Sequence, residues 1–107
     1  MSIDFNKRDH IAFITINSPC TGNALDRNSL AAMGEIIVNF DSDRELRVAI
    51  IRGCGDQAFC SGLDLQTIAK LPINPQQNDF PPSLMRGLCT NKPLIAAVNG
   101  AALGGGL

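Results

Sequence analysis

The chain ends in Lys92-Pro93-Leu94-Ile95-Ala96-Ala97-Val98-Asn99-Gly100-Ala101-Ala102-Leu103-Gly104-Gly105-Gly106-Leu107. The run from Leu94 to Val98 is short and apolar, which is typical of a buried strand in a parallel sheet. A glycine-rich turn after such a strand normally opens a helix, whose first N–H groups have no partner within the helix. Free N–H groups at a helix start bind anions. The stretch therefore predicts a buried strand that leads into an anion-binding turn.

A second apolar strand and a second glycine turn lie earlier in the chain. Val48 to Ile51 is a continuous apolar run, as expected of a strand covered on both faces, and Ser61-Gly62-Leu63-Asp64 contains the turn. In a parallel sheet, ligands bind at the edge where the carboxyl ends of the strands meet. Two backbone N–H groups that converge at this edge would polarise one carbonyl oxygen. That arrangement is an oxyanion hole.

Two more strands are predicted near the N-terminus. Ile3 and Phe5 alternate with polar residues, and the alternation resumes from His10 to Ile16. Lys7 to Asp9 lies between the two strands. The single histidine, His10, is interpreted as a strand residue and not as a catalytic one. With one histidine and no nucleophile elbow, a Ser-His-Asp hydrolase is not expected.

Helices are predicted between the strands. Asp26 is the expected N-cap of the first helix, which should end near residues 41–43 and has apolar residues at helical spacing: Leu30, Met33, Ile37 and Phe40. Asp64 is the expected N-cap of a short helix that continues to about Lys70. Residues 71–82 are expected to form a surface loop, either a lid or a disordered segment, and residues 80–89 a third helix. This order of elements predicts one α/β domain over residues 1–107.

Composition and charge exclude several function classes. The chain is 45% apolar and 18% charged with a net charge of −1, so a nucleic-acid surface with a basic stripe is not expected. No run is long enough to span a bilayer and no signal peptide is recognised, so the expected location is the cytoplasm without membrane attachment. The four cysteines have no metal-binding spacing and are expected to be reduced thiols without a metal: Cys20, Cys54, Cys60 and Cys89.

One motif suggests a nucleotide cofactor and is rejected. Gly53-Cys54-Gly55-Asp56-Gln57-Ala58 matches G-x-G-x-x-A directly after a predicted strand. A dinucleotide fingerprint must open a long helix, but Gly62 follows too soon and the helical period is missing.

Three blocks together resemble the enoyl-CoA hydratase/isomerase (crotonase) family. They are Pro19-Cys20-Thr21-Gly22-Asn23-Ala24-Leu25, Ala58-Phe59-Cys60-Ser61-Gly62-Leu63-Asp64-Leu65 and the strand with its triple glycine from Lys92 to Gly106. The blocks occur in the family's order and cover essentially the whole chain, but only the first part of the family's fold. The resemblance implies a partial spiral of ββα turns, with a mostly parallel core sheet and flanking helices.

The resemblance also implies a ligand and a set of site residues. The ligand is an acyl-CoA thioester, which is the substrate, so no separate cofactor is expected. The N–H groups of Leu63 and Gly105 would form the oxyanion hole and stabilise a thioester enolate, and the Ser61 carbonyl would meet the adenine amino group. The residues expected to bind CoA or substrate are Thr21, Ala24, Ser61, Gly62, Asp64, Leu65 and Gly104. Asp64 can also be a helix cap alone, and residues 104–106 a frayed tail.

Two departures from the family pattern lead to alternative hypotheses. Cys20 occupies a position that is often basic in the family and helps to hold a CoA phosphate. The resemblance places a catalytic Glu two residues after the triple glycine, whereas Leu107 is the first residue after it and the last of the chain, so the catalytic carboxylates are expected to be missing. The chain is then the acyl-CoA-binding part of an enzyme with weak or no turnover, a non-catalytic CoA-binding remnant, or an oligomerising domain. A homo-oligomer is expected because the apolar strands need covering.

Overall fold

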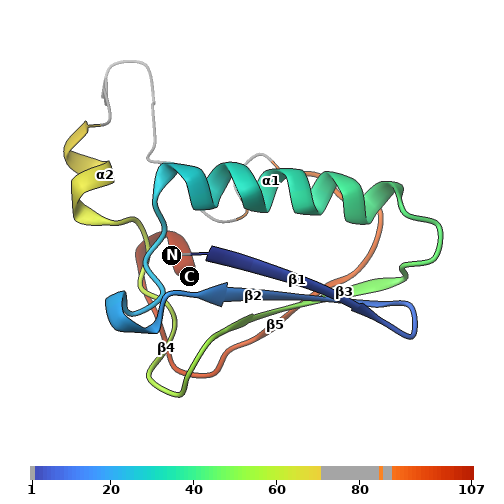
Figure 1. The fold of residues 1–107 in the computed structure, drawn as a ribbon, viewed down its shortest axis with the longest axis horizontal. Helices are drawn as coiled ribbons and strands as arrows, with labels where there is room; N and C mark the ends of the chain where they lie inside the picture. The colour runs from blue at the N-terminus through green and yellow to red at the C-terminus, as the bar shows by residue number, and fades with distance from the viewer. Residues whose placement is uncertain (1, 71–84, 86–87) are drawn as a thin grey trace.

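The computed structural model describes residues 2–70, 85 and 88–107. Its main sheet has the order β1-β2-β3-β5 and is formed by Ser2–Arg8, Ile11–Asn17, Val48–Gly53 and Leu94–Ala97. β1 and β2 are antiparallel, whereas the β2–β3 and β3–β5 pairs are parallel. Figure 1 shows one long helix, α1, running along one face of this sheet. The predicted α/β class with a mostly parallel sheet is confirmed.

The core lies between α1 (Arg27–Ser42) and the sheet. Met33, Ile37 and Phe40 are buried on the helix, as their spacing predicts, and they pack against the inward residues of β2 and β3. Those inward residues are Ala12, Ile14, Ile16, Ala49 and Ile51. The helix begins where the sequence predicts, because an Asp26 carboxylate oxygen accepts a hydrogen bond from the Ser29 N–H at 2.7 Å.

The Asp26 cap gives the fold a dependence on acidic pH. The hydrogen bonds from Ser29 hold the pKa of the Asp26 carboxyl below its usual value of 3.8, so ionised Asp26 favours the folded state. This contribution is present above the unfolded pKa and is lost as pH falls below about 3.8 through the folded pKa. We expect Asp26→Ala to lower the free energy of unfolding at pH 7 by about 1 kcal/mol. Urea titrations of wild type, Asp26→Ala and Asp26→Asn between pH 2 and 7 measure both effects. Asp26→Asn should keep most of the capping hydrogen bond, and its free energy of unfolding should depend less on pH. Equal pH dependence in all three proteins would contradict this account.

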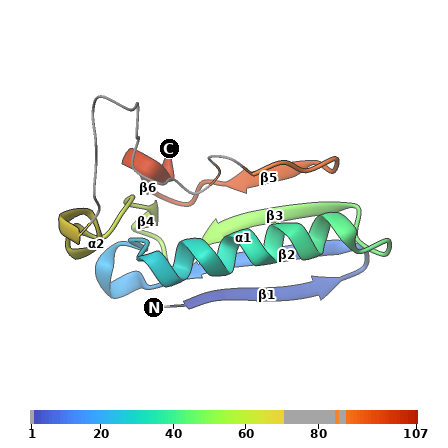
Figure 2. The same ribbon diagram turned by 90° about the horizontal axis from the view of Figure 1, so that it is seen from above.

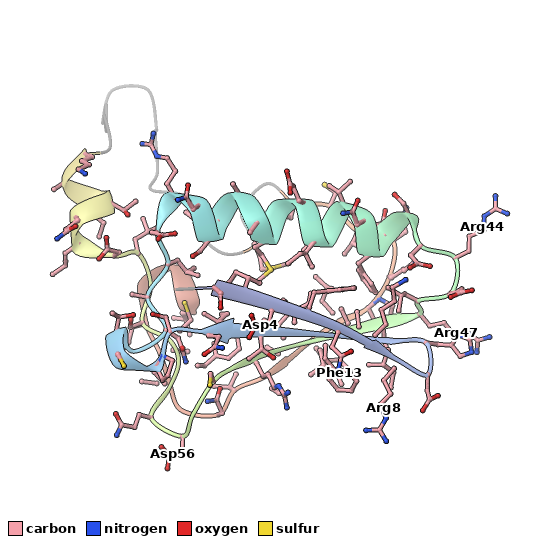
Figure 3. All side chains as sticks on the ribbon, viewed as in Figure 1. Asp4, Arg8, Phe13, Arg44, Arg47 and Asp56 are labelled. Atoms are coloured by element: carbon pink, nitrogen blue, oxygen red, sulfur yellow. The ribbon has the colours of Figure 1, made fainter. Side chains whose placement is uncertain are left out.

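The other face of the sheet is only partly covered in the described residues. Side chains alternate along a strand, so Phe13 points away from α1, as Figure 3 shows. β3 shows the same alternation, with Ala49 and Ile51 buried and Val48 and Ile50 only partly buried. The prediction that Val48–Ile51 is covered on both faces is therefore wrong for the described structure.

β5 is an exposed edge strand, which corrects a second prediction. Ile95 is 50% exposed and Val98 is 59% exposed, so the run from Leu94 to Val98 is not buried here. Figure 2 shows the reason, because α1 lies over β1, β2 and β3 while β5 is at the far side. An apolar run predicts a strand but does not identify what covers it. Self-association through such a surface remains a prediction.

His10 lies in a turn and not in a strand, which corrects a third prediction. Asp9 and His10 have φ values of 50° and 70°, and together they connect β1 to β2. The ring Nδ1 of His10 lies 2.7 Å from the Glu45 carbonyl oxygen, so the side chain ties this turn to the loop after α1. Figure 3 shows Arg8, Arg44 and Arg47 at the same end of the molecule, far from β4 and α2.

Lys92 fixes the start of β5 against the end of α1. Its ammonium group donates to the carbonyl oxygens of Phe40 and Asp43 and lies 5.1 Å from the centre of the Phe40 ring. A cation at a helix C-terminus pairs with the free carbonyl groups there. The Asp41 carboxylate also accepts from the Thr90 hydroxyl at 2.7 Å. These contacts place the entry to β5 beside the helix end.

A small second sheet connects the fold to the glycine turns. β4 (Ala58–Cys60) and β6 (Ala101–Ala102) are parallel neighbours, and α2 (Leu65–Lys70) follows β4. The chain after Gly53 enters β4, so the long helix that a dinucleotide fingerprint should open does not follow this motif. The predicted loop 71–82 and most of the predicted helix 80–89 lie outside the described residues. Within the described part of the chain, no helix has the length and apolar character needed to cross a membrane.

Candidate oxyanion hole

Both glycine turns follow the carboxyl ends of neighbouring parallel strands. Residues 61–64 follow β4, and the 3₁₀ turn Gly104–Gly106 follows β6. Ala58 pairs with Ala101 and Cys60 with Ala102, so the two turns leave the same edge of this sheet. Figure 2 shows the C-terminal turn beside β4. The topology thus brings together two segments that are far apart in the sequence.

The direction of the Leu63 N–H follows from the peptide that links it to Gly62. The Gly62 carbonyl oxygen accepts a hydrogen bond from the Leu25 N–H at 2.8 Å. In a trans peptide the C=O and the N–H point in opposite directions. The Leu63 N–H therefore points away from Leu25. Among the described residues it donates no backbone hydrogen bond.

The edge to which the Leu63 N–H points is occupied by the triple-glycine turn. On that side the Leu103 N–H donates to the Cys60 carbonyl oxygen at 3.0 Å. Gly62 has a φ of 99°, a conformation that a residue with a side chain rarely adopts. A Cβ added at Gly62 would lie 3.3 Å from the Gly105 nitrogen and 3.0 Å from the Leu103 carbonyl oxygen. The absence of a side chain at Gly62 thus lets the two turns approach each other.

The Gly105 N–H is also without a partner in the described residues. In its turn, the Gly106 N–H donates to Leu103 at 2.8 Å and the Leu107 N–H donates to Gly104 at 3.1 Å. The first N–H groups of a helical turn have no acceptor within that turn. Two free N–H groups, those of Leu63 and Gly105, therefore belong to segments in direct contact through Gly62.

Several predicted CoA-binding residues lie around the same segment. The Ser61 N–H donates to the Gly22 carbonyl oxygen at 3.1 Å, and the Ser61 hydroxyl donates to the Thr21 carbonyl oxygen at 3.4 Å. Ala24 lies two residues after Gly22 in the same loop, and its side chain is buried. The Ser61 carbonyl oxygen accepts no hydrogen bond from the described residues, so it is free to accept one from a ligand.

The remaining predicted residues lie around the start of α2 and in the C-terminal turn. An Asp64 carboxylate oxygen accepts from the N–H and the hydroxyl of Thr67, both at 3.2 Å, so Asp64 is the predicted cap. Leu65 is 79% exposed. Gly104 has a φ of 53° and begins the C-terminal turn. A surface hollow of about 410 Å³ adjoins Asp64, and its lining residues are Asp26, Arg27, Asn28, Asp64, Gln66, Thr67 and Lys70.

The two carboxylates close to the turns, Asp26 and Asp64, are occupied as helix caps. The pKa of Asp26 is lowered by its capping hydrogen bonds, so its carboxylate stays ionised. Burial raises the pKa of the Cys60 thiol, so Cys60 stays protonated and is a core residue. The described geometry can stabilise negative charge on a ligand atom. It does not present a general acid or base at this point.

The Asn99 side chain fixes the loop between β3 and β4, a role that the sequence analysis did not identify. Its side-chain oxygen accepts from the Gly53 N–H at 3.0 Å, and its amide donates to the Gly55 carbonyl oxygen at 2.8 Å. Asn23 stabilises its own loop, because its side-chain oxygen accepts a hydrogen bond from the Ser18 N–H at 2.9 Å. The available sequence signal for Asn99 is its place between an apolar strand and a glycine, which is typical of a loop residue.

The comparison with known families decides the classification. Residues 6–107 match the enoyl-CoA hydratase/isomerase family. The chain belongs to this family. The resemblance to the crotonases drawn from three short blocks is therefore confirmed over almost the whole chain.

Individual relatives agree with this assignment. The chain is 42% identical to a carnitinyl-CoA dehydratase of Citrobacter koseri, over 98% of this chain and 41% of the relative. It is 34% identical to an (E)-benzylidenesuccinyl-CoA hydratase of Thauera aromatica, over 100% of this chain and 43% of the relative. This member of the enoyl-CoA hydratase/isomerase family thus spans less than half the length of these relatives.

Solved structures confirm the crotonase-like fold. The crystal structure of a carnitinyl-CoA hydratase from Mycobacterium avium matches with a TM-score of 0.82 and 33% identity, over 97% of this chain and 41% of that protein. An enoyl-CoA hydratase from Mycobacterium tuberculosis matches with a TM-score of 0.78 and 29% identity, over 97% of this chain and 42% of that protein. The described elements are therefore a recognisable part of the family's fold.

Proposed function

We propose that this chain binds an acyl-CoA thioester and holds its carbonyl oxygen between the N–H groups of Leu63 and Gly105. The observation that supports this most directly is the close approach of the two turns: a Cβ at Gly62 would lie 3.3 Å from the Gly105 nitrogen, and both N–H groups lack partners among the described residues. Two donors aimed at one oxygen stabilise the negative charge that develops on it as an enolate forms.

The proposed ligand class follows from the family and from the polar groups around the hole. The relatives include enzymes named for carnitinyl-CoA and benzylidenesuccinyl-CoA, which are both CoA thioesters. The free Ser61 carbonyl oxygen offers an acceptor for the adenine amino group, next to the donors for the thioester. We propose a 2-enoyl or 3-hydroxyacyl thioester as the substrate class of the reaction.

The described residues supply charge stabilisation and not proton transfer. Addition of water to a 2-enoyl thioester requires one group that removes a proton from water and one that delivers a proton to C2. Asp64 and Asp26 are both occupied as helix caps, and the lowered pKa of Asp26 makes its carboxylate a weak base. This chain is therefore expected to bind and polarise a thioester with weak or no turnover.

Binding and polarisation are tested with crotonyl-CoA that carries ¹³C at the thioester carbonyl. We expect the chain to bind this ligand in a calorimetric titration and to move the carbonyl ¹³C resonance downfield, because two N–H donors withdraw electron density from the oxygen. Free CoA serves as the control without an acyl carbonyl. Binding with an unshifted carbonyl resonance, or no binding at all, would contradict the proposal. Rapid loss of the crotonyl double-bond absorbance would contradict the lack of proton transfer.

A further inference from the structure

Two asparagine side chains meet at one backbone carbonyl next to the proposed hole. The Ala58 carbonyl oxygen accepts a hydrogen bond from the Asn23 amide at 2.8 Å and another from the Asn99 amide at 3.1 Å. A carbonyl oxygen has two lone pairs, so these two amides use its full accepting capacity. Ala58 is the first residue of β4, the strand that leads directly to Leu63.

Each asparagine also holds the loop that precedes β4. The Asn23 amide donates to the Cys54 carbonyl oxygen at 3.0 Å. The Asn99 amide donates to the Gly55 carbonyl oxygen, and its oxygen accepts from the Gly53 N–H. The loop 53–58 is therefore fixed from two sides by side chains that come from different parts of the chain.

The segments that supply these asparagines are the same ones that build the hole. Asn23 lies two residues before Leu25, whose N–H and carbonyl bind the Gly62 carbonyl and the Asp64 N–H at 2.8 and 2.7 Å. Asn99 lies between β5 and β6, and β6 leads into the turn that contains Gly105. The two amides thus connect the loop of Asn23, the strand of Leu63 and the turn of Gly105.

We propose that Asn23 and Asn99 are positioning residues, which set the relative placement of the Leu63 and Gly105 N–H groups through their shared hydrogen bonds to the Ala58 carbonyl. This inference rests on the proposed thioester-binding function. Neither side chain touches the ligand in this account. Their effect on the ligand is transmitted by β4 and by the link from β5 to β6.

Asn99 is the better position for a test. Asn23 is fully buried and has a φ of 57°, so substitutions there combine loss of the amide with backbone strain. Asn99 is only half-buried and has no left-handed backbone. Asn99→Asp keeps the size of the side chain and the acceptor for Gly53, but an ionised carboxylate cannot donate to Gly55 or Ala58. Asn99→Ala removes the whole amide without adding a charge.

The experiment compares wild type, Asn99→Asp and Asn99→Ala with ¹³C-carbonyl crotonyl-CoA and with free CoA, well below each protein's unfolding temperature. Asn39→Asp adds the same charge on an exposed position of α1 and is the matched control. For both Asn99 variants we expect the downfield change in the carbonyl ¹³C chemical shift on binding to fall by at least about half. The Kd of crotonyl-CoA should rise about tenfold, which corresponds to the free energy of one lost hydrogen bond. The Kd of free CoA should stay within about twofold of wild type, because CoA has no acyl carbonyl for the hole to hold.

The outcomes separate positioning from a structural role. An unchanged carbonyl shift in both Asn99 variants would overturn this inference and leave the proposed function intact. Equal losses of affinity for crotonyl-CoA and free CoA, in proportion to the unfolded fraction, would show a structural role only and would also overturn it. If the wild-type chain itself shows no carbonyl shift, the proposed function fails and the inference fails with it.

Discussion

Replacement of the Gly105 N–H by an ester oxygen is expected to slow deuterium exchange at C2 of a bound acyl-CoA by about 10²–10³-fold, the usual effect of removing one oxyanion donor. In D₂O, a buffer base removes the C2 proton and the bound thioester becomes an enolate, with its negative charge on the oxygen that accepts from Leu63 and Gly105 in the proposed complex. A deuteron from solvent then returns to C2. The exchange rate therefore measures how well the chain stabilises the enolate, without a catalytic base from the protein.

The chain offers a route to this substitution and a matched control. Residue 89 is a cysteine, so a synthetic peptide of residues 89–107 with glycolic acid in place of Gly105 can be joined through this N-terminal cysteine to a thioester of residues 1–88. The ester also weakens the Gly104 carbonyl as an acceptor for the Leu107 N–H, which donates to it at 3.1 Å. An ester at Leu107 removes the same hydrogen bond and leaves the Gly105 N–H in place. The assigned role of Gly105 would be refuted by a wild-type exchange rate in the Gly105 ester. It would also be refuted if the two esters lowered the exchange rate equally.

Gly106→Ala is expected to lower the free energy of unfolding by about 3 kcal/mol and to abolish the accelerated exchange. A Cβ at Gly106 would lie less than 3.0 Å from the Cys60 carbonyl group, which is backbone and cannot rotate away. The turn must then separate from β4, which removes Gly105 from Leu63. Urea titration gives the stability change, and ¹H NMR in D₂O gives the exchange rate.

Gly34→Ala is the matched control for Gly106→Ala. Gly34 lies within α1, and an added Cβ there would have no neighbour within 4 Å. Because glycine is unfavourable inside a helix, we expect this substitution to raise stability by about 0.5–1 kcal/mol and to leave the exchange unchanged. If Gly106→Ala is as stable as Gly34→Ala, the close packing of the C-terminal turn on β4 is wrong.

The helices and turns near the site could be predicted because their signals are local. Asp26 and the apolar spacing after it define the start and the buried face of α1, and both are confirmed. Asp64 is likewise confirmed as a cap. The order of the elements also indicated a mostly parallel sheet, because strands that are separated by a helix or another long connection can run in the same direction.

The errors concern properties that depend on distant parts of the fold. The run from Leu94 to Val98 is apolar, but its exposure depends on whether another element covers β5, and no local pattern contains that information. His10 continues an apolar alternation, yet the preceding Asp9 adopts a left-handed turn that places His10 outside the strand. The hydrogen bonds of Asn99 join residues more than 40 positions apart, so they became visible only in three dimensions.

The convergence of the Leu63 and Gly105 N–H groups on one thioester oxygen can be measured directly by NMR. The chain is labelled with ¹⁵N at leucine and glycine and titrated with crotonyl-CoA and with free CoA. This account predicts that the amide protons of Leu63 and Gly105 both move downfield as crotonyl-CoA saturates the chain, in parallel with the ligand's carbonyl ¹³C, and that free CoA produces neither change. If only one of these amide protons responds, or if both respond equally to free CoA, the two groups do not share a thioester oxygen.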